Sequence, residues 1–316
     1  MATLTVPPMP VSPRDDAIQL YKAFKGLGCD KPAVIGILAH RDATQREYIR
    51  QEYRTMYSDD ILKRLASELS GHLQIAVSLW MPDPAARDAA ILKKGLTRNF
   101  INLVAVTEII CTRTSSQLQA VTKIYHSTFG TQLDYDLKLQ IFGDTQKILL
   151  ACISKQRYEG MEVDREMAAK DAKALYKAGE KRLGTDEKVF VQIFSERSRP
   201  HLVAINTCYQ DMYGSSLKKA VKKETSGLFE TALLTILQCA ENPAKYFAKM
   251  LHKSMKGLGT FDTRLIRVIV TRTEIDMQYI KAEYYKKYKK TLNDAVHSET
   301  SGHYRTFLLS LLGPNH

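Results

Sequence analysis

Glycine-containing loops recur in this chain at one fixed distance ahead of glutamates. The last glycine of each loop stands 40 residues before its acid, in the pairs Gly28 and Glu68, Gly184 and Glu224, and Gly259 and Glu299. Glycine accepts positive φ and brings no side chain, so such a loop can turn backbone carbonyls toward one point. Carbonyls beside a carboxylate form an oxygen-only ligand set, which suits a hard divalent cation, calcium above all. The spacing therefore predicts three calcium sites.

A leucine stands at the apex of each loop; the three are Leu27, Leu183 and Leu258. Three carbonyls and a bidentate glutamate give roughly five oxygens of the 6–8 that calcium takes, so water or a lipid phosphate can complete the shell. A leucine that enters the lipid interface gains roughly 1.5–3 kcal/mol on full burial. The pattern thus predicts calcium-dependent attachment to anionic membranes. The competing interpretation, helix-end punctuation with the leucine packed inward, leaves the paired glutamates unexplained.

Arginines supply a second landmark, 13 residues after the loop glycine and 27 before the acid, at Arg41, Arg197 and Arg272. Arg113 ends a similar apolar run, but Phe100 and Gln140 occupy the positions of its glycine and its acid. Asp144 is four residues out of register. The chain therefore holds four copies of one unit, and the second copy is predicted to have no calcium site of this type.

Helices are expected to build every copy. Apolar residues step by three and four, as at Ile18, Tyr21 and Phe24, and no alternating strand pattern stands out. The period of about 75 residues requires several helices in each copy. We predict an all-α protein with a short N-terminal segment, 1–13, and repeats I to IV over 14–81, 86–155, 164–240 and 245–313. Residues 81–87, 158–164 and 242–243 read as linkers.

Composition fits a globular protein with anionic partners. The 316 residues carry a formal charge of +12 with 44% hydrophobic content. No apolar run approaches the roughly 18 residues of a membrane span, and the N-terminus does not resemble a signal peptide. Five scattered cysteines without a CxxC pair favour a reducing compartment.

These residues resemble the annexin family. The segments 25–28, 181–186 and 256–260 are similar to its calcium loops, and the Thr-Ser-Gly that follows Glu224 and Glu299 is similar to its acidic half. The match runs from about Asp15 to Gly313, and the segment 79–88 resembles plant annexins. The resemblance implies four repeats of about five helices each, arranged as a curved disc with calcium sites on its convex face.

The resemblance also implies a ligand set for each site. Repeat I is expected to use the carbonyls of Phe24, Gly26 and Gly28 with the Glu68 side chain. Repeat III is expected to use the carbonyls of Gly179, Arg182 and Gly184 with Glu224. Repeat IV is expected to use the carbonyls of Met255, Gly257 and Gly259 with Glu299. Cys29 replaces the usual threonine of the first loop.

An enzyme is one alternative, because plant annexins have been proposed to act as peroxidases or nucleotide hydrolases. His40 is a lone histidine for which a structural or solvent role is favoured, and no GxxxxGK[ST] loop is present. Cys111 and Cys239 match a cysteine pair of plant annexins, so they are the candidate redox residues, with core packing favoured.

Actin or nucleic-acid binding through the basic surface is the other alternative. Residues 266–268 resemble a proposed actin segment, whereas nucleic acid is disfavoured. The leading interpretation is a non-enzymatic calcium and phospholipid binder, cytoplasmic and peripheral at membranes in the presence of calcium, that can oligomerise there. Secretion, membrane repair and stress response remain open as its cellular setting.

Overall fold

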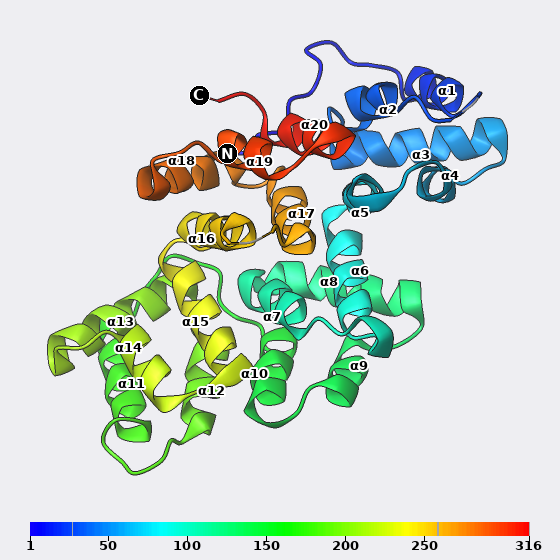
Figure 1. Ribbon diagram of the computed structural model, residues 1–316. Helices are drawn as coiled ribbons and strands as arrows, with labels where there is room; N and C mark the ends of the chain where they lie inside the picture. The colour runs from blue at the N-terminus through cyan, green and yellow to red at the C-terminus, as the bar shows by residue number, and fades with distance from the viewer. Residues whose placement is uncertain (27, 258, 316) are drawn as a thin grey trace. The chain divides into compact units, whose positions relative to one another are not determined.

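The computed structural model describes residues 1–26, 28–257 and 259–315 (Figure 1). Within these residues every regular element is helical: twenty α-helices and one short 3-10 helix, η1. The prediction of an all-α protein with five helices in each of four repeats is confirmed. Among the described helices, none combines the length and the apolar character needed to cross a bilayer.

The helices follow in four sets of five. The first set is α1 (Pro13–Ala23), α2 (Lys31–Leu38), α3 (Ala43–Tyr57), α4 (Ile61–Glu68) and α5 (Gly71–Trp80). The second is α6 (Pro84–Gly95), α7 (Leu103–Thr112), α8 (Ser115–Phe129), α9 (Leu133–Gln140) and α10 (Gly143–Ser154), with η1 (Arg98–Phe100) between α6 and α7. The third is α11 (Arg165–Ala178), α12 (Glu187–Glu196), α13 (Arg199–Tyr213), α14 (Leu217–Glu224) and α15 (Gly227–Glu241). The fourth is α16 (Pro243–Met255), α17 (Asp262–Arg272), α18 (Met277–Tyr288), α19 (Leu292–Glu299) and α20 (Gly302–Leu312).

These sets form two compact units. One unit joins Met1–Arg87 to the segment from Phe247 onward, and the other is Asp88–Tyr246. In the first unit α5 packs against α17 and α20, so the fourth repeat returns to the first. The N-terminal segment is held there too, because the Thr3 amide donates to the Thr273 carbonyl at 2.9 Å. In the second unit the tightest pairs include α7 with α15 and α10 with α12.

In repeats I to III the landmark arginine pairs with an aspartate from the first helix of its own repeat. Both oxygens of Asp16 accept from Arg41, at 2.7 and 2.8 Å. Asp88 holds Arg113 in the same fork, at 2.6 and 2.8 Å, and Asp171 holds Arg197 in repeat III. Such bidentate pairs fix orientation as well as distance, so the arginine locks the first helix of a repeat to the end of the second.

Repeat IV replaces this aspartate by an aromatic ring. Phe247 stands 25 residues before Arg272, where Asp16 stands before Arg41. The Arg272 guanidinium lies 4.4 Å from the Phe247 ring centroid and turns to Asp276, to which it donates at 2.7 and 2.8 Å. A cation–π contact thus takes the place of the interhelical ion pair.

Stacked rings join the first and third helices in repeats I, III and IV. Tyr21 stacks on Tyr57 with ring centroids 3.8 Å apart, and Tyr176 stacks on Tyr213 in the same way. In repeat IV the pair is His252 and Tyr288, at 3.7 Å. Each stack fixes the end of a first helix against the end of a third, which steadies the point from which the loop departs.

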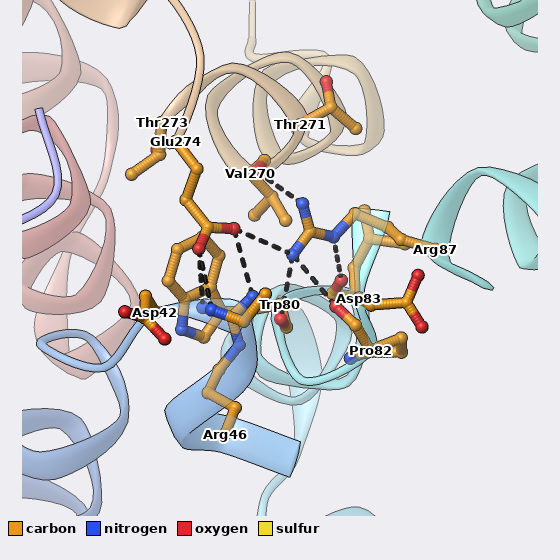
Figure 2. Close-up of polar contacts among 12 residues, drawn as sticks. Asp42, Arg46, Trp80, Pro82, Asp83, Arg87, Val270, Thr271, Thr273 and Glu274 are labelled. Atoms are coloured by element: carbon orange, nitrogen blue, oxygen red, sulfur yellow. Dashed lines mark hydrogen bonds and ion pairs between the residues drawn. The ribbon is translucent and has the colours of Figure 1, made fainter. Parts of the chain in front are cut away.

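The segment 81–87, expected to be a linker, is buried at its two ends in the first unit. Met81 and Arg87 are buried, and α6 already begins at Pro84. Arg87 donates to the carbonyls of Trp80 and Val270 at 3.0 and 3.2 Å (Figure 2). The connection between the two helices is therefore 81–83, shorter than the expected linker, and the arginine satisfies backbone carbonyls from two repeats at once.

Candidate metal sites in the glycine loops

The first loop joins α1 to α2. Gly26 and Gly28 have φ of 116° and 92°, values that residues with a side chain rarely adopt. The loop closes when the Asp30 amide donates to the Ala23 carbonyl at 2.9 Å. Leu27, the predicted apex, lies outside the described residues. The backbone conformation of this loop therefore requires glycine at both positions, as predicted for a loop that turns its carbonyls toward a metal ion.

The fourth loop, between α16 and α17, repeats this geometry. Gly257 and Gly259 have φ of 118° and 92°, within two degrees of the first loop. The Phe261 amide closes it by donating to the Ser254 carbonyl at 2.8 Å. Leu258 lies outside the described residues. Two loops far apart in the sequence thus share one backbone conformation.

The third loop is longer. Its closing bond runs from the Asp186 amide to the Ala178 carbonyl at 2.7 Å, eight residues apart rather than seven. Gly184 has φ of 76°. The Gly179 carbonyl, one predicted ligand, accepts from the Arg182 amide at 3.0 Å. The extra residue explains why Asp171 and Arg197 are one residue further apart than their counterparts in repeats I and II.

The structure brings loop and acid together in repeats III and IV. The Thr185 hydroxyl lies 3.2 Å from Glu224 Oε2, and the Thr260 hydroxyl lies 3.0 Å from Glu299 Oε2. Each hydroxyl also contacts the backbone carbonyl of the same glutamate, at 2.9 and 3.4 Å. In both repeats, therefore, a hydroxyl that directly follows the last loop glycine contacts the predicted acid. Sequence reasoning gave this residue no role, although its place after the glycine was visible.

Repeat I departs from this arrangement at its acid. Cys29 stands where the threonine stands in the other loops, and Glu68 pairs with Arg64 of its own helix at 3.5 Å. Burial raises the pKa of the Cys29 thiol, and the nearby charge of Glu68 raises it further. In repeat I, therefore, an arginine of the same helix pairs with the acid, and a cysteine stands in place of the threonine hydroxyl.

Repeat II keeps the scaffold and changes the surface. The Asn102 amide closes the α6–α7 loop by donating to the Gly95 carbonyl at 2.9 Å, as in repeats I and IV. Phe100 ends η1 with 62% of its surface exposed. Gln140, at the end of α9, replaces the acid. Asp144, in the first turn of α10, pairs with Lys147 of the same helix at 2.8 Å.

The apex of the third loop points into solvent. Leu183 is fully exposed, so the competing interpretation of an inward-packed leucine fails at this loop. Phe261, directly after Thr260 in the fourth loop, is 65% exposed and was missed in the sequence. Its signal was a phenylalanine at the helix N-cap, where Asp30 and Asp186 stand in the equivalent loops.

The residues proposed for enzyme chemistry have structural partners. His40 Nδ1 lies 2.8 Å from the Thr5 hydroxyl and 3.0 Å from the Thr5 carbonyl, so this ring anchors the N-terminal segment. Cys111 and Cys239 are buried. Cys111 and Cys152 are free thiols, and a hydrogen bond with Cys152 together with burial raises the pKa of Cys111. Cys152 was not among the candidate redox residues.

Comparisons with known proteins follow the same four-part division. A profile of the annexin family matches residues 15–80, 87–152, 170–236 and 246–311. The chain is 55% identical over 315 residues to Annexin D5 of Arabidopsis thaliana, with 100% of each chain covered. It is 41% identical over 297 residues to Annexin A13 of Mus musculus, with 94% of each covered.

Solved structures agree. Annexin III superimposes with a TM-score of 0.96 at 36% identity, covering 100% of this chain and 98% of that chain. Calcium-bound annexin (Sm)1 superimposes with a TM-score of 0.86 at 29% identity, covering 100% and 94%. The family profile matches four segments, the chain is 55% identical to a plant annexin over its full length, and the described residues form twenty α-helices. The chain therefore belongs to the annexin family and is of the plant type.

Proposed function

We propose that this chain binds anionic phospholipid membranes in a calcium-dependent manner through the loops of repeats I, III and IV. Annexins as a family bind calcium and associate peripherally with anionic phospholipid membranes. The observation that supports the proposal is the contact of loop with acid, in which the hydroxyls of Thr185 and Thr260 lie within hydrogen-bond distance of Glu224 and Glu299.

The donor set fits calcium. Each loop offers backbone carbonyls and a single carboxylate, all hard oxygen donors. In repeat I these are the carbonyls of Phe24, Gly26 and Gly28 with Glu68. The third and fourth sets are Gly179, Arg182 and Gly184 with Glu224, and Met255, Gly257 and Gly259 with Glu299. When bound, calcium supplies positive charge that attracts a lipid phosphate into its open positions.

The exposed apices supply the apolar part of the contact. Leu183 stands free in solvent, and Phe261 adds an aromatic ring beside the fourth loop. Leu27 and Leu258 are proposed to act as Leu183 does. Apolar side chains that enter the interface add to the electrostatic attraction of an anionic surface. The formal charge of +12 favours that surface at low salt.

Cosedimentation with phosphatidylserine vesicles tests the proposal. The protein should pellet with calcium and return to the supernatant with a chelator. Glu299→Gln should raise the calcium midpoint, whereas Gln140→Ala, in the repeat without an acid, should leave it unchanged. Binding that is equally strong with and without calcium at physiological salt would contradict the proposal.

We propose a binding protein rather than an enzyme. His40 is engaged by Thr5, and the thiols of Cys111 and Cys239 are buried, which supports packing roles for all three. Attachment is proposed to be peripheral, at the cytoplasmic side of a membrane, where thiols stay reduced. F-actin binding, suggested by the basic charge and by residues 266–268, and self-association on the membrane stay secondary proposals.

A further inference from the structure

Both ends of the chain lie against α18 and border a cavity of about 780 Å³. The Gln278 amide, in the first turn of α18, donates to the Met1 carbonyl at 3.0 Å. The Thr3 hydroxyl donates to the carbonyl of Leu311 in α20 at 2.7 Å. Figure 1 shows the N-terminus beside α18 and α19, and all of these residues belong to the first compact unit. Hydrogen bonds to the helices therefore hold the N-terminal wall of the cavity in place.

The C-terminal wall is held in the same way. The Asn293 side-chain amide donates to the Gly313 carbonyl at 2.7 Å. Gly313 has φ of 65°, and a Cβ added there would lie 2.9 Å from the Thr3 carbonyl oxygen. The glycine therefore lets the two ends of the chain pass close to each other. The cavity has preformed walls on both sides, as small-molecule sites usually do.

The accessible lining of the cavity is mostly apolar. Five residues at positions i, i+3, i+4, i+7 and i+8 of α18 form one wall: Gln278, Lys281, Ala282, Tyr285 and Lys286. Tyr285 is 56% exposed, and Leu4 and Pro314 line the same cavity with part of their surface accessible. Among the described lining residues the phenol of Tyr285 is the one aromatic ring. The lining therefore favours an alkyl chain over a flat aromatic ligand.

The charge of the cavity has one sign. Lys281 and Lys286 line it, and within the described part of the lining no residue is an aspartate or a glutamate. Lys281 Nζ donates to the Leu312 carbonyl at 2.9 Å and to the Pro314 carbonyl at 2.7 Å. An ammonium has three N–H groups, so the third is left to donate to a ligand. Burial lowers the pKa of Lys281, and an anion beside this ammonium would offset the lost hydration.

The cationic groups suit a single negative charge. The described lining contains no arginine, the residue whose planar fork matches a phosphate. A lysine is a compact charge with rotatable donors, and Lys281 has already given two of its donors to carbonyls. The volume lies within the range of about 300–1,000 Å³ that is usual for small-molecule sites. A carboxylate on an alkyl chain fits this combination of one charge, aliphatic walls and limited volume.

We propose that this cavity binds a single-chain carboxylate, a fatty acid in chemical class, with its head at Lys281 and its chain along Leu4, Ala282 and Tyr285. The site goes beyond the proposed function, because it uses neither the glycine loops nor a bilayer. Its walls come from the two ends of the chain, so a bound carboxylate contacts both ends at once. Residues 2–5 of the N-terminal segment thereby become part of a ligand site.

Isothermal titration calorimetry with decanoate tests the proposal. The full-length protein is titrated below the micellar range of decanoate and without vesicles. A chelator keeps the proposed calcium sites empty and prevents calcium soaps. Wild-type protein should bind one decanoate per chain. Decanol, which has the same chain without the charge, should bind at least about 10-fold more weakly, since a charge-assisted hydrogen bond is lost.

Two variants separate the charge of the cavity from its space. Lys281→Met keeps an unbranched side chain and should weaken decanoate binding about 10-fold while leaving decanol binding unchanged. Ala282→Phe places a ring in the cavity and should weaken the binding of both ligands about 10-fold or more, because the alkyl chain loses its apolar contacts. The controls are Lys287→Met, on α18 outside the cavity, and Ala120→Phe, at an exposed position of α8. Both controls should bind decanoate as the wild type does.

Each result decides for or against the site. Absence of decanoate binding by the wild type overturns the inference, and so does binding that Ala282→Phe leaves unchanged. Equal affinity for decanoate and decanol overturns the place given to Lys281. Ala282 is exposed and its side chain makes no hydrogen bond, so Ala282→Phe decides the matter even if Lys281→Met lowers the stability. Calcium-dependent cosedimentation of Ala282→Phe should match that of the wild type, so failure of this site leaves the proposed function untouched.

Discussion

The hydroxyl of Thr185 lies 3.2 Å from Glu224 Oε2 and 2.9 Å from the Glu224 carbonyl, so one side chain ties the third loop to its acid across 39 residues of sequence. Thr260 does the same for Glu299 in the fourth loop. Positions that orient a metal ligand without binding the metal commonly change affinity 10- to 100-fold when they are altered. We therefore propose that the two threonines position the acids of the proposed calcium sites.

Thr185→Val and Thr260→Val together should raise the calcium midpoint for vesicle binding by about 10-fold, because Glu224 and Glu299 lose the hydroxyls that orient them. Cys29→Thr should act in the opposite direction at the first loop by offering Glu68 a hydroxyl. Calcium titrations of vesicle cosedimentation measure both. Thr207→Val, at a helix surface, is the control. An unchanged midpoint in the double variant would show that the hydroxyls are incidental.

Gly179→Ala should weaken the third site specifically. A Cβ added at Gly179 would lie 2.9 Å from Glu224 Cγ, so the carboxylate must move away from the loop. We expect loss of one calcium from the stoichiometry measured by isothermal titration calorimetry, with little loss of fold stability. Gly36→Ala is the control, since it has open space in helix α2 and should stabilise that helix by about 1 kcal/mol. Full stoichiometry in Gly179→Ala contradicts the prediction.

His252 should make stability depend on pH near neutrality. Burial lowers the pKa of His252, and the charges of Lys256 and Lys287 lower it further. A histidine whose pKa is lower in the folded state contributes stability that is complete above its unfolded pKa of about 6.5 and is lost as the pH falls through the folded value. The melting temperature should therefore drop between pH 7 and pH 5 through this group.

His252→Tyr is the matched variant, because repeats I and III stack Tyr21 and Tyr176 at this position. Its melting temperature should depend less on pH over the same range, as measured by differential scanning calorimetry. Equal slopes for wild type and variant would show that His252 does not titrate across the unfolding transition.

Substitution of Glu274 should lower the folding stability more than substitution of most other acids in the first unit. It pairs with Arg46 at 3.1 Å and with Arg87 at 3.6 Å, and both guanidiniums are buried against Trp80 (Figure 2). Glu274→Gln removes the charge that compensates two buried cations and should cost about 3–5 kcal/mol. Chemical denaturation measures the loss. Glu47→Gln, whose partner Arg50 is exposed, should cost under about 1 kcal/mol.

Thiol titration of the folded protein should leave Cys111 and Cys239 unmodified until denaturant is added. Both are buried, and the raised pKa of Cys111 disfavours its thiolate, the reactive form. Cys29 and Cys208, which are partly exposed, serve as internal references for accessible thiols. Rapid reaction of either buried cysteine without denaturant would revive the redox alternative.

Much of the fold could be predicted from the sequence, because each repeat contains the same local sequence signals in the same order. The 40-residue spacing from Gly28 to Glu68 is the length of three helices and their turns, so it recurs wherever the scaffold recurs. Arg113 kept the register of repeat II even though Phe100 and Gln140 had changed. Helix periodicity and glycine conformation are local properties, and local properties can be read from sequence.

The sequence by itself determined the all-α class and the four repeats, and it predicted the pairing of three loops with three acids. Only the tertiary structure decided which groups meet: that Arg41 pairs with Asp16, that the Thr185 hydroxyl meets Glu224, and that Met81 and Arg87 are buried. It also decided that Leu183 faces solvent. The physical reason is that hydrogen-bond partners and exposure depend on helices packing across tens of residues, and no period along the chain encodes that packing.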